Sequence, residues 1–326
     1  MEVIIKPTGR CNFACEFCSA GNMDNCTKHP SDGKVQKSII DFLDKTKNLH
    51  GLIITGGDPL MVDPSYYYEL YERYNVPISI TTNLKDFYFH PEKWAPLFRE
   101  SWFSACTSFN YGTRRRWDKN TPYTEDMFLK VMEVWKKYIS DRYPSFLAVI
   151  DKDNENTVMD HIMLAKRLNT RVKLNCAIAC GKQQESYPRY KMFQFYIDII
   201  DKGLEQYETY CADRFYSKCP RNINLQCISN IRCIYEDLNG KIHVGTCDEQ
   251  VSEGIELDPE IWFPENCFKE KIKKDDLINP DKCTFCELYR LCNGCRTNRM
   301  VSKQFPEYCD EMLKLKNKII EQGWLL

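Results

Sequence analysis

Charge of one sign is not in excess in this sequence. Its 326 residues include 45 basic and 46 acidic side chains, which gives a formal net charge of −1. Proteins that bind nucleic acid or an anionic membrane through electrostatics carry a basic surplus. We therefore expect neither a nucleic-acid partner nor a membrane partner.

Long hydrophobic runs are also missing. No run approaches the ~18 apolar residues of a membrane-spanning helix. The first eight residues lack the apolar core and the small-residue cleavage site of a secretory signal. These absences predict a cytoplasmic protein. Histidine is scarce, with five residues and no HxxxH-like pair, so nothing in the sequence indicates a zinc hydrolase.

Cysteine, in contrast, is abundant. The 18 cysteines are about 5.5% of the chain, which is above ordinary usage but below the ~8–10% of small disulfide scaffolds. Because the cytosol keeps thiols reduced, metal or cluster binding explains them better than disulfides do. Four lie in the first thirty residues, three in the long middle and eleven between Cys211 and Cys309. This uneven distribution places a domain boundary near residues 206–215.

The segment before that boundary alternates strand-like and helix-like patterns. The predicted strands are Val3–Ile5, Leu52–Thr55, Ile78–Thr81, Phe103–Phe109, Phe146–Ile150 and Val172–Ala179. The clearest helical patterns run over Val35–Leu43, Tyr67–Tyr74, Phe128–Trp135 and Met192–Leu204. Six strand–helix units in a row imply parallel strands joined by right-handed crossovers, in either an open doubly wound sheet or a partial barrel. In both architectures the reactive loops follow the carboxyl ends of the strands.

The tail after the boundary lacks this alternation. Two short strand-like runs, Ile231–Tyr235 and Lys241–Val244, flank Asn239-Gly240, a pair typical of hairpin turns. A final helix is predicted over Cys309–Ile320. A segment with so many loops has too few apolar residues for a hydrophobic core of its own. Metal clusters would supply cross-links in its place. We expect two domains, residues 1–206 and residues 207–326.

A loop directly after the first predicted strand carries Cys11, Cys15 and Cys18 in a C-x3-C-x2-C arrangement. Three thiolates on one short loop can hold three irons of a 4Fe–4S cluster and leave the fourth iron without a protein ligand. Such an open iron can bind a small chelating molecule and pass it an electron. A zinc site usually has four closing ligands in C-x2-C pairs, which this loop lacks. A zinc knuckle or simply buried thiols are the alternative interpretations.

This loop, with the aromatic Phe17 before the third cysteine, resembles the signature of the radical S-adenosylmethionine (SAM) superfamily. The resemblance implies an α/β fold, a partial (β/α)6 TIM-like barrel followed by a small cysteine-rich iron–sulfur domain. It also implies that Cys11, Cys15 and Cys18 ligate a 4Fe–4S cluster whose open iron chelates SAM. Reductive cleavage of SAM would yield a 5′-deoxyadenosyl radical that abstracts a hydrogen atom from the substrate. The reducing partner would be a protein such as flavodoxin or ferredoxin.

Other residues match the family's SAM contacts. The segment Gly56-Gly57-Asp58-Pro59 is similar to the family's Gly-Gly-Glu-Pro, which holds the methionine amino group, with Asp in place of Glu. Two glycines at a strand end also let the backbone approach a ligand closely. Further expected contacts are Asn83 after the third strand, Ser108 after the fourth, and Arg116 in the run Arg114–Arg116. An arginine of this run would pair with the SAM carboxylate, although a solvated charge run is the alternative.

The cysteines of the tail resemble the SPASM extension of radical SAM peptide-modifying enzymes. The C-x2-C-x5-C core matches that signature fully, whereas two neighbouring spacings differ from it by one or two residues. The family's connectivity implies two auxiliary 4Fe–4S clusters. The first would use Cys227, Cys233, Cys247 and Cys295, and the second Cys283, Cys286, Cys292 and Cys309. Cys219 is an alternative to Cys227, and a pair of structural zinc sites is the alternative to the clusters.

Three 4Fe–4S clusters and SAM suit net two-electron oxidations such as cross-link formation, because a closed cluster near a radical can accept its electron. Asp248, beside Cys247, is the candidate base for a substrate radical, and an ordinary surface Asp is the alternative. The leading expectation is an enzyme that modifies a ribosomally made peptide or protein. Oxidation of a small molecule such as a sugar alcohol, and a non-catalytic iron–sulfur or zinc protein, stay open.

Overall fold

The computed structural model describes residues 2–21, 23–30, 32–179, 181–215, 231–245, 286–292, 302 and 305–324. Five of the predicted site residues lie outside this part of the chain: Cys227, Cys247, Asp248, Cys283 and Cys295. The alternative ligand Cys219 lies outside it too. Their roles stay predictions.

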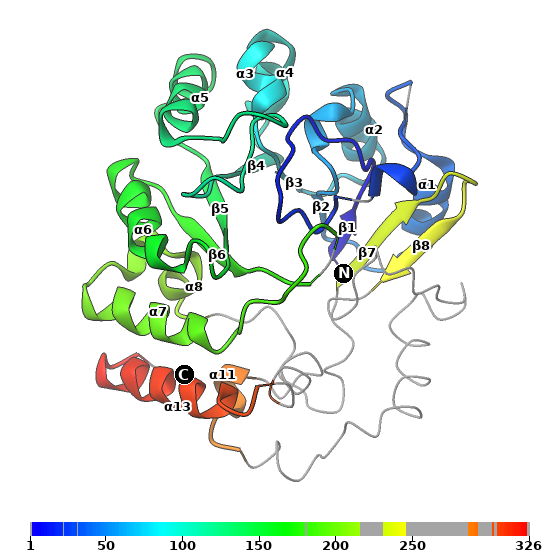
Figure 1. The fold of residues 1–326 in the computed structure, drawn as a ribbon. Coiled ribbons are helices and arrows are strands. Elements are labelled where there is room, and N and C mark those ends of the chain that lie inside the picture. Colours follow the sequence, from blue (N-terminus) through cyan, green and yellow to red (C-terminus); the bar gives the residue numbers. More distant parts are fainter. Residues whose placement is uncertain are drawn as a thin grey trace.

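Six parallel strands form most of one curved sheet (Figure 1). They are β1 (Glu2–Ile5), β2 (Gly51–Ile54), β3 (Ile78–Thr81), β4 (Phe103–Ser108), β5 (Ser145–Ile150) and β6 (Val172–Cys176). Strands that follow each other in the sequence are neighbours in the sheet, and each pair is parallel. With helical crossovers this is the order of a partial TIM-like barrel, so the predicted α/β fold is confirmed. The sixth predicted strand is too long, because β6 ends at Cys176 rather than Ala179.

Helices connect these strands and cover the outer side of the sheet in Figure 1. They are α1 (Lys37–Asp44), α2 (Ser65–Tyr74), α3 (Lys85–Phe89), α4 (Pro91–Phe98), α5 (Glu125–Tyr138), α6 (Val158–Arg167), α7 (Lys191–Asp201) and α8 (Thr209–Ala212). Short 3-10 turns are η1 (Met23–Asn25), η2 (Pro59–Met61), η3 (Glu155–Thr157) and η4 (Glu205–Tyr207). The four helices with clear apolar periodicity are confirmed as α1, α2, α5 and α7.

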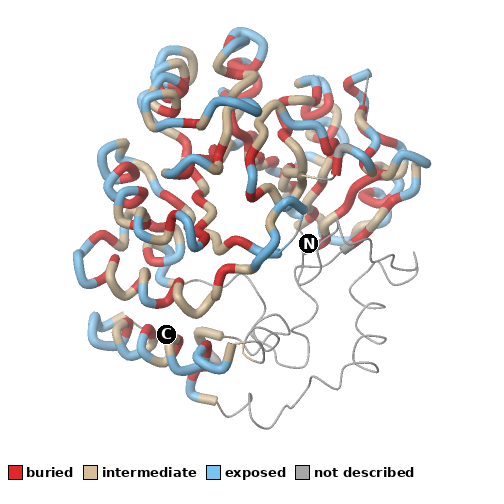
Figure 2. Tube along the Cα trace, viewed as in Figure 1, coloured by how far each residue is buried: buried red, intermediate tan, exposed pale blue. Residues whose placement is uncertain are grey.

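Side chains alternate between the two faces of the sheet. Val3 and Ile5 of β1 are fully buried, whereas Glu2 and Ile4 are only half-buried. The strands β2 and β5 show the same alternation. Because side chains on one face of neighbouring strands line up across the register, the buried set forms the core beneath the helices. Figure 2 shows this buried layer running through the strands, with exposed residues on the outer turns of the helices.

A hairpin from the tail extends the same sheet. Strand β7 (Ile231–Glu236) pairs parallel with β1, and β8 (Ile242–Gly245) pairs antiparallel with β7. The predicted turn is confirmed, with Gly240 at φ +82°, the left-handed conformation that glycine adopts without steric cost. The sequence did not predict that β7 would join the barrel sheet beside β1. The division at residues 206 and 207 stays a prediction.

The last part of the chain packs against the barrel. Helix α13 (Tyr308–Glu321), which confirms the predicted final helix, lies beside α7 (Figure 1). The rings of Phe193 and Tyr308 are 5.1 Å apart at this contact, and Lys318 pairs with Asp201. The short helix α11 (Tyr289–Cys292) precedes α13. Among the described residues, every helix is too short or too polar to cross a bilayer.

Candidate cofactor site

The segment after β1 contains the three closely spaced cysteines. We refer to residues 6–20 as the cluster loop. Cys11 is exposed, Cys15 is buried and Cys18 is half-buried, and all three are free thiols. The loop leaves the carboxyl end of β1 and contacts the ends of four other strands, as the next paragraphs show. This is the edge at which parallel α/β sheets place their reactive loops.

The end of β2 holds the first part of the cluster loop through its backbone. The N–H of Gly57 donates to the carbonyl of Thr8 at 2.9 Å, and the N–H of Asp58 donates to that of Arg10 at 2.7 Å. A Cβ added to Gly57 would lie 2.0 Å from the Arg10 carbonyl oxygen. Glycine is therefore required here for the close approach of two backbones. Among the described residues, no donor bonds to the carbonyls of Gly56 or Gly57, so both can accept from an ammonium group.

The carboxylate of Asp58 faces the protein. It accepts hydrogen bonds from the N–H of Leu60 at 2.9 Å, from the N–H of Asn83 at 2.7 Å and from the hydroxyl of Thr82 at 2.9 Å. Only 2% of the residue is exposed, and this burial raises the pKa of the carboxyl group to about 6 despite the three donors. Asp58 thus ties the end of β2 to the end of β3. Its neighbour Pro59 begins η2.

Asn83, at the end of β3, connects this pair to the cysteines. Its side-chain Nδ2 donates to the side-chain oxygen of Asn12 at 2.9 Å and lies 3.7 Å from the sulfur of Cys11. Asn83 is buried, at 5% exposure, and its backbone N–H donates to Asp58. The predicted site residues on β2 and β3 therefore come together on the first half of the cluster loop.

The segment after β4 holds the second half of the cluster loop. The N–H groups of Ala14 and Glu16 donate to the carbonyls of Arg116 and Arg114, at 3.1 and 2.9 Å. The side chain of Arg116 pairs with Glu16, and that of Arg114 pairs with Asp151. Both guanidinium groups therefore already have a carboxylate partner.

Arg115 is different from its two neighbours. It is buried, at 7% exposure, and donates to Asn110 Oδ1 and to Ser108 Oγ, each at 2.9 Å. Its guanidinium carbon lies 5.1 Å from the centre of the Phe17 ring in the cluster loop, within cation–π range. Among the described residues, no carboxylate pairs with Arg115. The sequence pointed to Arg116, and the missed residue carried no signal of its own within three consecutive arginines.

The connection after β6 closes the loop on its far side. The N–H of Lys182 donates to the carbonyl of Cys18 at 3.0 Å. Gly181 has φ +62°, and a Cβ there would lie 2.4 Å from the Ser19 carbonyl oxygen. The backbone of Cys18 and the residue after it is thus packed against a second glycine.

Two of the three thiols hold their protons more tightly than free cysteines do. Partial burial, the charge of Asp58 and the neighbouring thiols raise the pKa of Cys11 to about 12. Burial and the nearby Cys15 raise the pKa of Cys18. Cys11 and Cys18 are therefore protonated in water at neutral pH, so metal binding must release their protons. Among the described residues, no three potential ligands converge on one ion, whereas the cysteines of a 4Fe–4S cluster each bind a different iron.

The described tail cysteines lie on different elements. Cys233 is half-buried on β7, where its register partner is Ile4 of β1. Cys286 precedes α11, Cys292 ends it, and Cys309 lies in α13. Cys233 packs with Cys26 against Met23 and Tyr235, so one predicted auxiliary ligand lies close to the segment that follows the cluster loop. The grouping of the eight tail cysteines stays a prediction.

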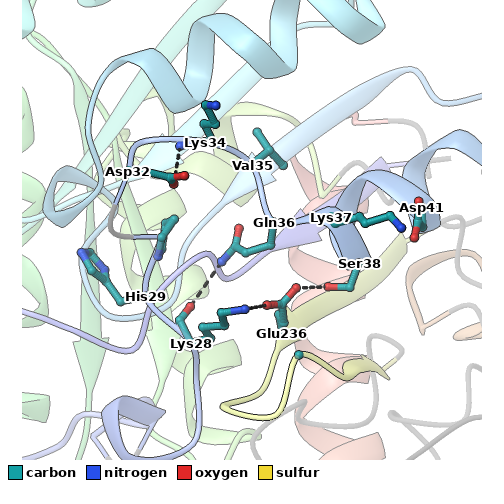
Figure 3. A pocket seen from close by; sticks show the side chains of 12 residues that line it. Lys28, His29, Asp32, Lys34, Val35, Gln36, Lys37, Ser38, Asp41 and Glu236 are labelled. Atoms are coloured by element: carbon teal, nitrogen blue, oxygen red, sulfur yellow. Dashed lines mark hydrogen bonds and ion pairs between the residues drawn. The ribbon is translucent and has the colours of Figure 1, made fainter.

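A cleft of about 520 Å³ lies beside this site. Residues between Lys28 and Asp41 line it together with Glu236 and Gly240 of the hairpin (Figure 3). Lys28 Nζ lies 3.0 Å from Glu236 Oε1, and Ser38 donates to the same carboxylate. Lysines and carboxylates balance in the lining, and no predicted site residue belongs to it. The cleft therefore offers no selective charge for the cofactor.

Solved structures with a similar fold support the architecture. One is described as native anSMEcpe with bound AdoMet and Cp18Cys peptide, with a TM-score of 0.64 and 17% identity over 98% of this chain and 97% of that one. Another is Streptococcus suis SuiB bound to precursor peptide SuiA, with a TM-score of 0.58 and 16% identity over 94% and 74% of the two chains. At such identities the likeness concerns the fold.

Sequence comparisons give one relative and one family model. A stretch of 90 residues is 35% identical to the uncharacterized protein MJ0907 of Methanocaldococcus jannaschii. That stretch is 25% of this chain and 30% of the relative, so the chain spans under a third of the relative's length. The family model of the radical SAM superfamily matches residues 5–165, the part of the chain that contains the cluster loop and the ends of β2 to β5. The chain belongs to the radical SAM superfamily, and this membership implies a 4Fe–4S cluster and SAM as cofactors.

Proposed function

We propose that this chain is an oxidoreductase that cleaves SAM at a cluster held by Cys11, Cys15 and Cys18 and oxidatively modifies a peptide or protein. The observation that carries the proposal is the packing of the ends of β2, β3, β4 and β6 around the loop with these thiols. Bound SAM supplies, on reduction, a 5′-deoxyadenosyl radical that takes a hydrogen atom from the substrate. The chain's own residues bind, orient and shield the reacting groups.

The two charged ends of the SAM methionine find complementary groups on opposite sides of the loop. The carbonyls of Gly56 and Gly57 accept from the amino group, in agreement with the sequence prediction. Arg115 binds the carboxylate in place of Arg116, because its charge is buried and unmatched by any described carboxylate. Ser108 orients Arg115 through its hydroxyl. A charge-assisted contact from a buried arginine contributes more binding free energy than the same contact from a solvated arginine.

The tail would provide two closed auxiliary clusters and the base Asp248, as a separate domain over residues 207–326. The SPASM resemblance of its cysteines supports this part of the proposal. The peptide substrate is supported by the two solved structures of similar fold, both of which contain a peptide. A closed cluster that accepts the electron of a substrate radical suits a net two-electron oxidation such as a cross-link.

Anaerobic reconstitution tests the proposal directly. We expect about twelve irons per chain, from three clusters of four, and release of 5′-deoxyadenosine under a strong reductant. Replacement of Cys11, Cys15 and Cys18 by alanine should abolish that release. A peptide encoded next to the gene should lose two hydrogens, as mass spectrometry would show. Zinc in place of iron, or no 5′-deoxyadenosine, would contradict the enzyme, whereas turnover of a small molecule alone would contradict the peptide substrate.

A further inference from the structure

Lys85 contacts the cluster loop from the start of α3. Its ammonium donates to the carbonyl of Asn12 at 3.0 Å and to the carbonyl of Trp117 at 2.6 Å. Asn12 lies between the first two cysteines, and Trp117 follows the arginines after β4. One side chain therefore joins the end of β3, the cluster loop and the segment after β4.

Aromatic rings surround this ammonium. It lies 4.7 Å from the centre of the Trp117 ring and 5.8 Å from that of Phe13. The two rings are 5.5 Å apart and contact each other over the loop. Cation–π contact of this kind strengthens when the ammonium is partly withdrawn from water.

The charge of Lys85 has no direct counter-ion within the described part of the chain. Within the described residues no carboxylate lies within ion-pair distance of its ammonium, and burial lowers its pKa. Asp118, and Cys11 once it has lost its proton, are the negative groups that act on it from nearby. A lysine held by two carbonyls differs from one that only covers apolar surface, since its ammonium is fixed on the residue that follows Cys11, a thiol predicted to bind iron.

We propose that Lys85 is a positioning residue that clamps the stretch between Cys11 and Cys15 and places a positive charge beside the Cys11 thiolate, which raises the reduction potential of the cluster. This inference rests on the cluster proposed above for the three thiols. A nearby cation stabilises the reduced cluster, which carries one more negative charge than the oxidised one. Hydrogen bonds and local charge are recognised controls of iron–sulfur potentials.

The test compares the cluster-loaded wild type with three variants: Lys85→Met, Lys85→Arg and Lys93→Met. Lys93 is a matched control, because it also lies over a tryptophan ring but forms an exposed pair with Asp63. Redox titration followed by electron paramagnetic resonance should give Lys85→Met a more negative midpoint potential, with Lys85→Arg and Lys93→Met close to the wild type. A cluster-loaded Lys85→Met with the wild-type midpoint potential overturns the proposal.

A second measurement needs no cluster. In the metal-free protein, alkylation of thiols mapped by mass spectrometry reports how firmly the loop is held. In Lys85→Met, Cys11 and Cys15 should be alkylated several-fold faster than in the wild type, with Cys106 of β4 as an internal reference. In Lys85→Arg, the two rates should stay near those of the wild type. Unchanged labelling in Lys85→Met overturns the clamp even if that variant binds no cluster. Absence of a cluster from the wild type would instead contradict the proposed function.

Discussion

The two sides of the cluster loop are held by different physical means. On the β2–β3 side, backbone N–H groups of Gly57 and Asp58 bond to loop carbonyls, and one buried carboxylate organises the strand ends. On the β4 side, backbone bonds are accompanied by three arginines. Two of them pair with carboxylates, and the third has no carboxylate partner among the described residues. The first side determines where the loop lies, and the second determines which charge the loop and its ligand meet.

The largest effect should come from Gly57→Ala, which tests the first side. The new Cβ would lie 2.0 Å from the Arg10 carbonyl oxygen, so the loop must move. We expect a loss of about 3 kcal/mol of stability, as for overpacked sites, together with loss of the cluster. Urea unfolding and iron content measure both. Gly51→Ala, in the strand that precedes Gly57, is the control, since the nearest neighbours of the new Cβ would be 3.8 Å away. Equal behaviour of the two variants would refute the close-packing explanation.

Asp58→Asn tests the buried carboxylate. In the folded chain its pKa is raised from 3.8 to about 6, so the folded state holds the proton more tightly than the unfolded state. The resulting stabilisation is fully present below about pH 3.8 and is lost as the pH rises through about 6. Its upper limit is about 3 kcal/mol, from roughly two units of pKa.

This predicts a pH-dependent difference between two proteins. The free energy of unfolding of metal-free wild type, minus that of Asp58→Asn, should fall between about pH 4 and pH 7. Urea titrations at several pH values measure it. A difference that is constant across this range would show that Asp58 ionises as readily in the folded chain as in the unfolded one.

Arg115→Met tests the role of the arginines on the β4 side of the loop. Loss of a buried, charge-assisted contact should weaken SAM binding about 10- to 100-fold, corresponding to roughly 1.5–3 kcal/mol. Equilibrium binding of SAM to the cluster-loaded variant measures this. Unaltered affinity would remove Arg115 from the proposed SAM contacts.

The smallest effect is expected for Arg116→Gln. Its pair with Glu16 is partly solvated, with 26% and 44% of the two side chains exposed, and such pairs contribute less than about 1 kcal/mol. SAM affinity should therefore stay near that of the wild type in the same binding assay. A loss of SAM affinity as large as that of Arg115→Met would favour Arg116 as the residue that binds the SAM carboxylate, as the sequence predicted.

Local patterns predicted the regular elements well. The six strands, five of the helices and the hairpin turn were located because alternation, helical periodicity and an Asn-Gly pair act over a few residues. The patterns did not locate α4 or α6. Helix α4 has only eight residues, with prolines at its start and inside it, so its apolar positions show little periodicity. Its burial against the sheet, rather than its propensity, stabilises it.

The sequence by itself determined the spacing of Cys11, Cys15 and Cys18, the strand that precedes them and the glycines that follow β2, because each depends on neighbours along the chain. Tertiary structure decided which arginine keeps an unmatched charge, that Asp58 turns inward, and that β7 joins β1. Arg116 and its partner Glu16 are 100 positions apart in the sequence. The choice among three adjacent arginines depends on which carboxylates the fold brings near, and no short-range pattern carries that information.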